Sequence, residues 1–156
     1  MAGHTDNAVV INAPLDLVWD LTNDIPNWPS LFSEYASTEV LSTSAEGAVI
    51  FRLTMHPDPA GRVWSWVSER VPDRADKVVR ARRLETGAFK YMNLFWEYTE
   101  IPGGGVRMRW VQDFEMRPGG HADDEGMTAH LNRTTREQQA RIREIVEKVA
   151  AERGQS

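Results

Sequence analysis

The chain has 156 residues, of which 41% are hydrophobic, a formal net charge of −5 and no cysteine. This length is enough for one domain with a sizeable core. The acidic balance argues against a general nucleic-acid-binding surface, and the lack of cysteine excludes disulfides, thiolate metal ligands and a cysteine nucleophile.

The chain begins with a polar stretch, residues 1–7, that lacks the charged start and apolar run of a signal peptide. No apolar run in the sequence approaches the roughly 20 residues of a membrane span. We therefore expect a soluble cytoplasmic protein with no membrane or nucleic-acid partner, folded as one domain over residues 1–156.

The next elements alternate with clear turn signals. Residues 5–12 predict a first strand, Pro14 fits the first turn of a short helix, and residues 25–32 predict a second short helix broken by prolines. Gly and Pro turns then separate six predicted strands at about 35–43, 48–56, 62–71, 77–86, 90–100 and 105–116. The short and regular spacing favours an antiparallel sheet.

A long helix is predicted from Asp123, which can cap its N-terminus, to about residue 153. Apolar and semi-polar residues recur there at helical spacing and predict an inward face of Met127, Leu131, Thr134, Gln138, Ile142, Ile145 and Val149. The element order predicts an α+β helix-grip fold. In that fold a curved seven-stranded antiparallel sheet wraps around the C-terminal helix, with two short helices after the first strand.

The strand at 62–71 carries the most informative pattern in the chain. Read with period two, one face holds Arg62, Trp64, Trp66, Ser68 and Arg70. Indole N–H and guanidinium groups need partners when buried, so this face suits a wet, aromatic-lined wall that binds an oxygen-rich organic molecule. Arg62, at the start of the strand, is expected at the rim or in solvent.

The last two strands extend this wall. Their alternation predicts inward residues that include Met92, Leu94, Trp96, Tyr98, Met108, Trp110, Gln112 and Phe114. The strand at 77–86 is polar on both faces, so alternation does not decide whether Arg83 points inward. Taken singly, each Trp or Met is better explained as ordinary core, and Arg70 is equally well explained as a strand-end charge or the partner of a glutamate.

Other chemistries lack their motifs. The histidines in termini and loops have no partner at metal-ligand spacing, and Asp123–Glu125 fits a helix start better than a metal site. His130 is better explained as helix surface or a satisfied buried histidine than as a catalyst. Neither a Ser-His-Asp arrangement nor a phosphate or dinucleotide loop is visible, so we expect no metal and no cofactor.

At this point the sequence resembles the aromatase/cyclases of bacterial aromatic (type II) polyketide synthesis, within the START-like (SRPBCC) superfamily. The likeness covers about residues 4–150, and the tetracenomycin aromatase/cyclase and the spore-pigment cyclases are among the proteins that the chain resembles. Its blocks include Asn12-Ala-Pro14, Leu31-Phe-Ser-Glu-Tyr35, Trp66-Val-Ser68, Arg70-Val-Pro-Asp73 and Tyr91-Met-Asn-Leu94. The first block is shared across many START-like domains, whereas the second and the last together are specific.

The resemblance implies a poly-β-ketone substrate on the phosphopantetheine arm of an acyl carrier protein, with the other synthase subunits as partners. It implies aldol closure of the first ring, typically C9–C14, then dehydration to an aromatic ring, with a second ring closed in some members. It assigns Tyr35, Arg70 and Arg83 to catalysis. It assigns the pocket between sheet and helix to Trp28, Trp66, Ser68, Met92, Trp96, His130 and Gln138, to which alternation adds Met108, Trp110 and Phe114.

The chemistry suggests roles for these residues. Arg70 stays protonated and is expected to hold the reacting carbonyl, while Tyr35, with its phenol pKa lowered by Arg70, is expected to act as acid and base. Glu34 is expected to point away from Tyr35. Two alternatives remain: a chaperone that only shapes the chain, and a START-like carrier of a hydrophobic ligand. An acidic carrier protein would dock on a local basic patch drawn from Arg52, Arg62, Arg80 and Arg82.

Overall fold

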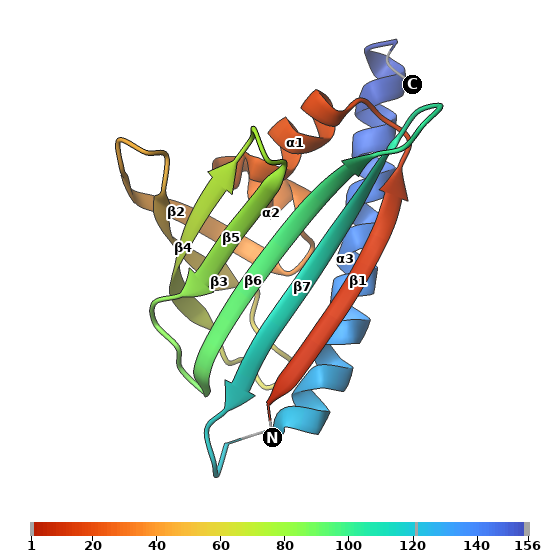
Figure 1. The fold of residues 1–156 in the computed structure, drawn as a ribbon. Coiled ribbons are helices and arrows are strands. Elements are labelled where there is room, and N and C mark those ends of the chain that lie inside the picture. The colour runs from red at the N-terminus through yellow and green to blue at the C-terminus, as the bar shows by residue number, and fades with distance from the viewer. Residues whose placement is uncertain (1, 121, 155–156) are drawn as a thin grey trace.

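The computed structural model describes residues 2–120 and 122–154, and Figure 1 shows a curved sheet with one long helix running beside it. In chain order the elements are β1 (Gly3–Ile11), α1 (Leu15–Asn23), the short 3-10 helix η1 (Ile25–Asn27), α2 (Trp28–Leu31), β2 (Tyr35–Thr43), β3 (Val49–Met55), β4 (Ser65–Asp73), β5 (Val78–Arg83), β6 (Phe89–Glu100), β7 (Val106–Met116) and α3 (Asp124–Glu152). The seven strands form one antiparallel sheet in the order β1-β7-β6-β5-β4-β3-β2. The predicted helix-grip fold is confirmed.

One predicted strand begins later than expected. β4 starts at Ser65, because the Asp58 carboxylate accepts hydrogen bonds from the backbone of Ala60 and Arg62 and from the Trp64 indole, which folds residues 58–64 into a loop. Trp64 is 38% exposed, so the expectation that it shares a wall with Trp66 is wrong. Arg62 is exposed as expected, with its guanidinium 5.1 Å from the centre of the Trp64 ring.

The long helix α3 begins as predicted, since the Asp123 carboxylate accepts a 2.7 Å hydrogen bond from the Gly126 backbone. Its buried face is turned slightly from the predicted one and holds Thr135, Gln138, Gln139, Ile142, Val146 and Ala150. The cause is a polar seam with β1 that apolar periodicity does not detect. Asn7 donates to Asn132 and accepts from Arg136, while Gln139 donates to the Asn7 carbonyl.

β2 lies at one edge of the sheet and pairs irregularly with β3. Its register shifts between Tyr35 and Ser37 and again between Val40 and Ser42. In each shift one residue of β2 has no partner opposite it, which is the signature of a β-bulge.

The buried side chains form two apolar clusters on the inner side of the sheet. The larger one joins α1, α2 and α3 to the sheet, and the smaller one consists of Phe89, Met92, Phe114 and Met116. Between them on β7 lies Gln112, whose side-chain oxygen accepts hydrogen bonds from Thr5 and Thr135. No helix within the described residues is long and apolar enough to cross a bilayer.

Candidate functional site

The strand register confirms the predicted inward rows of β6 and β7. Met92 lies opposite Phe114, Leu94 opposite Gln112, Trp96 opposite Trp110 and Tyr98 opposite Met108. Side chains directly opposite each other share a face of an antiparallel sheet, and most of these residues are buried. We call this face of the sheet the inner wall.

Aromatic rings from several elements meet at the inner wall. Trp96 and Trp110 stack with ring centres 4.1 Å apart, and Trp28 of α2 stacks on Trp96 at 6.2 Å. Phe32 lies 5.9 Å from Trp110, and Tyr35 lies 6.1 Å from Trp28. Sequence reasoning missed Phe32, although it belongs to the Leu31–Tyr35 block.

Arg70 is buried at the inner wall, with 3% of its surface exposed. Its Nε and Nη2 donate to the Asn23 side-chain oxygen at 3.2 and 2.9 Å, and the Tyr98 hydroxyl is a further hydrogen-bond partner. The guanidinium carbon also lies 4.2 Å from the centre of Trp96 and 5.1 Å from that of Trp28. Burial lowers the Arg70 pKa to about 10, so the group stays cationic at neutral pH, and its hydrogen bonds go to the protein.

Arg83 is the second inward cation, and the structure decides what alternation left open. It lies opposite Ser68, which lies opposite the buried Phe51, so all three share the inner wall. The guanidinium carbon is 4.2 Å from the centre of Trp66 and 4.9 Å from that of Phe89. Its buried Nε has no hydrogen-bond partner among the described residues. Burial lowers the Arg83 pKa to about 10, which leaves a charged donor beside aromatic rings.

Tyr35 points inward because of the first bulge of β2. It lies opposite Met55, whereas Thr38 lies opposite the core residue Leu53, and regular alternation over three residues would put Tyr35 on the other face. Burial raises the pKa of the Tyr35 phenol, with Glu34 raising it further against the opposing effects of Arg83 and Arg70. Arg70 acts in the expected direction, but burial outweighs it. The expectation of a lowered Tyr35 pKa is therefore wrong, and Tyr35 is a neutral hydrogen-bond donor.

Glu34 is a titratable group that sequence reasoning undervalued. Burial, with the Glu137 carboxylate adding to it, raises the Glu34 pKa to about 7. Its charge also acts on Tyr35, so Glu34 is an electrostatic neighbour of that phenol. The sequence held only one signal for this, the adjacency of the two residues.

Gln138 fastens α3 to the segment that leads into β2. Its side-chain oxygen accepts from the Ser33 backbone at 2.9 Å, and its amide donates to the Ser33 hydroxyl at 2.7 Å. Arg141 adds hydrogen bonds to the carbonyls of Leu31 and Ser30. These four bonds, which we call the latch, occupy the amide that was predicted to bind substrate.

The remaining predicted residues fall into two groups. Ser68, Met92, Trp96, Met108, Trp110 and Phe114 are all buried on the inner wall. His130 is exposed on α3 and lies 3.1 Å from Arg133 through its Nδ1, and partial burial lowers its pKa. His130 thus lies at the helix surface.

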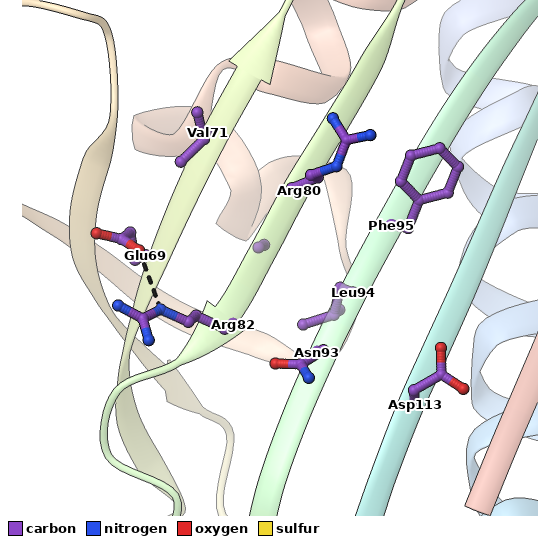
Figure 2. A pocket seen from close by; sticks show the side chains of 9 residues that line it. Glu69, Val71, Arg80, Arg82, Asn93, Leu94, Phe95 and Asp113 are labelled. Carbon is purple, nitrogen blue, oxygen red and sulfur yellow. Dashed lines mark hydrogen bonds and ion pairs between the residues drawn. The ribbon is translucent and has the colours of Figure 1, made fainter.

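A separate groove of about 350 Å³ lies on the opposite face of the sheet, across β4 to β7. Figure 2 shows the side chains that border it, among them Arg80, Arg82 and Phe95. Arg82 pairs with Glu69 at 3.1 Å, and Arg80 lies 5.3 Å from the centre of Phe95. Arg80 and Arg82, two residues of the predicted basic patch, therefore lie on this outer face, where Glu69 partly neutralises their charge.

Comparison with known proteins shows the family of this chain. The profile of the family described as "Polyketide cyclase / dehydrase and lipid transport" matches residues 3–149. A Streptomyces cyaneus protein named as an inferred polyketide cyclase is 61% identical over 150 residues, which is 96% of this chain and 97% of that protein.

Two solved structures share the fold. The Zhui aromatase/cyclase from Streptomyces sp. R1128 gives a TM-score of 0.83 at 23% identity and covers 95% of each chain. A START superfamily protein from Mycobacterium smegmatis gives 0.71 at 10% identity, over 96% of this chain and 97% of that one. At such identities the likeness concerns the fold alone.

Proposed function

Because the chain belongs to the polyketide cyclase/dehydrase and lipid transport family, we propose that it closes the first ring of a poly-β-ketone by aldol condensation and aromatises it. The observation that carries this proposal is Arg83, a cation held between aromatic rings with a buried donor that no described residue accepts. Such a group is suited to an oxygen atom that gains negative charge.

Ring closure needs two proton transfers and the formation of one carbon–carbon bond. A methylene between two ketones loses a proton, the resulting enolate carbon attacks a ketone further along the chain, and the new alkoxide takes up a proton. Loss of water and a further enolisation then give the aromatic ring. Since the methylene is already acidic, a carboxylate with a pKa near 7 is a sufficient base, and Glu34 has that property.

The residues divide the work as follows. Arg83 holds the enolate or alkoxide oxygen, and the neutral Tyr35 phenol donates the proton. Arg70 acts through the rings it contacts, Trp28 and Trp96, and is a positioning residue. This assignment moves the carbonyl contact from Arg70 to Arg83.

Folding of the substrate is the larger task, because a flexible chain with many ketones can react in many ways. Stacked rings at the inner wall restrict the chain and exclude water, which turns random encounters into one oriented intramolecular reaction. The inward-facing Trp66 and Arg83 keep part of their surface accessible, and we place the substrate beside them. The resemblance to type II aromatase/cyclases implies that the first ring closes between C9 and C14 and that a second ring can follow. Both statements belong to the same proposal.

Delivery by an acyl carrier protein, with other type II synthase subunits as partners, is part of the proposal. Carrier proteins of this kind are acidic, so contact requires a local basic surface on this acidic chain. The groove in Figure 2 offers Arg80, whereas Arg52 is paired with Glu85.

The experiment is product analysis with a minimal synthase, with and without this protein. Adding the protein is expected to replace a mixture of rings by one first-ring product. Tyr35→Phe keeps the aromatic ring and removes the phenolic O–H that donates the proton. We therefore expect the initial rate to fall about 10²-fold and the remaining product to keep its regiochemistry. An unchanged rate with Tyr35→Phe would favour the chaperone, and equal product mixtures with and without the protein would favour a ligand carrier.

A further inference from the structure

Trp110 carries the second unmet donor of the inner wall. Its side chain is 5% exposed, and its indole Nε1 has no hydrogen-bond partner among the described residues. Buried polar groups in folded proteins are nearly always paired, and a buried tryptophan N–H usually finds an acceptor. An unpaired one therefore needs an explanation.

The neighbours of Trp110 show why the protein does not supply an acceptor. Its ring is held between Trp96, at 4.1 Å, and Phe32, at 5.9 Å, neither of which offers one. Asn7 lies directly opposite on β1, but its side-chain oxygen accepts from Arg136 and its carbonyl from Gln139. The polar residue opposite Trp110 is thus already bonded to α3.

We propose that the Trp110 indole N–H is a second oxygen anchor, which donates a hydrogen bond to a carbonyl or phenolic oxygen of the bound ligand while Arg83 holds another. The two donors come from β7 and β5, which β6 separates. Strands two apart lie roughly 10 Å from each other, so the ligand must carry acceptor oxygens at separated positions. A fatty acid has oxygens at one end only, whereas a polyketide or hydroxyquinone has them along its length. The proposal rests on the proposed function for the identity of the natural ligand.

The stacked pair provides a matched control, because Trp96→Phe and Trp110→Phe remove the same atoms from two halves of one aromatic stack. Three probes separate the contributions: 2-hydroxy-1,4-naphthoquinone, naphthalene, which has the same two rings without oxygens, and decanoate. The indole N–H signals of ¹⁵N-labelled wild-type protein, assigned by triple-resonance spectra, report hydrogen bonding at each tryptophan without any need for catalysis.

The quinone is expected to move the Trp110 N–H signal downfield, and naphthalene and decanoate are expected to leave it nearly in place. Trp110→Phe is expected to weaken quinone binding about tenfold, as the loss of one buried hydrogen bond does, and Trp96→Phe about two- to threefold. A Trp110 signal that responds equally to naphthalene, or that the quinone does not move at millimolar concentration, would overturn the proposal. A downfield shift together with failure of the cyclisation assay would retain this anchor and reject the proposed reaction.

Discussion

Arg70 and Arg83 occupy the same face of adjacent strands, and both are surrounded by aromatic rings, yet they are in opposite states. Arg70 donates to Asn23 and Tyr98 and lies beside Trp28 and Trp96. Arg83 lies against the rings of Trp66 and Phe89, and its Nε has no acceptor among the described residues. A buried cation that is fully bonded stabilises a structure, whereas one that lacks an acceptor is available to a ligand.

The largest effect that tests this difference between Arg70 and Arg83 is expected from removing Arg83. Arg83→Ala is expected to lower the rate of first-ring formation about 10²–10³-fold, as the loss of one preorganised donor does. The unfolding free energy is expected to stay within about 1 kcal/mol of wild type, because no protein hydrogen bond is lost. Product analysis by chromatography and urea unfolding measure the two effects. Full activity of Arg83→Ala would reassign the oxygen contact.

Removing Arg70 is expected to affect the unfolding free energy more strongly than removing Arg83 does. Arg70→Ala empties the space between two tryptophans and leaves the Asn23 oxygen without its donors, so we expect a loss of about 2–4 kcal/mol in unfolding free energy. Arg70→Lys keeps the charge but lacks the planar guanidinium with its several N–H donors. Its unfolding free energy is expected to lie between those of wild type and Arg70→Ala. Unfolding in urea tests this. Wild-type stability for Arg70→Ala would show that the cation serves only the ligand.

A pH titration adds to the comparison, because Glu34 acts electrostatically on Tyr35, on which Arg83 also acts. The Glu34 pKa is raised to about 7, so the folded state binds a proton that the unfolded state releases near pH 4.5. The contribution of Glu34 to the unfolding free energy should therefore be fully present below about pH 4.5. It should fall by on the order of 2 kcal/mol as the pH rises to about 7. Glu34→Gln is expected to flatten this part of the stability curve. A wild-type curve that rises over the same range would contradict the assignment.

The smallest effect is expected at the latch. Ser33→Ala removes one of its hydrogen bonds, and Gln138→Ala removes two, so we expect losses of about 0.5 and 1–2 kcal/mol in unfolding free energy with a parallel, several-fold loss of rate. If Gln138 instead binds substrate, Ser33→Ala leaves the rate unchanged while Gln138→Ala lowers it. Steady-state kinetics of both variants separate these cases.

The sequence predicted the fold and most of the wall because β6 and β7 alternate cleanly, so that the rows of Trp96 and Trp110 could be read directly. It failed where a local feature overrode alternation. Asp58 folded Trp64 into a loop, and polar residues on both faces of β5 left Arg83 undecided. The Tyr35 pKa depends on burial, which adjacent charges in the sequence do not reveal.

Edge strands of open sheets invite pairing with a second copy, and β2 is such an edge. Its two unpaired residues, Ala36 and Leu41, bend the strand at both ends of its central part, so its free N–H and C=O groups do not form a straight template. The bulge at Ala36 that turns Tyr35 inward thus also hinders edge-to-edge aggregation. Deleting Ala36 would leave Tyr35 opposite Met55 and on the inner face, because Tyr35 and Thr38 would then be two residues apart. It would also give a straighter edge that favours pairing with a second copy.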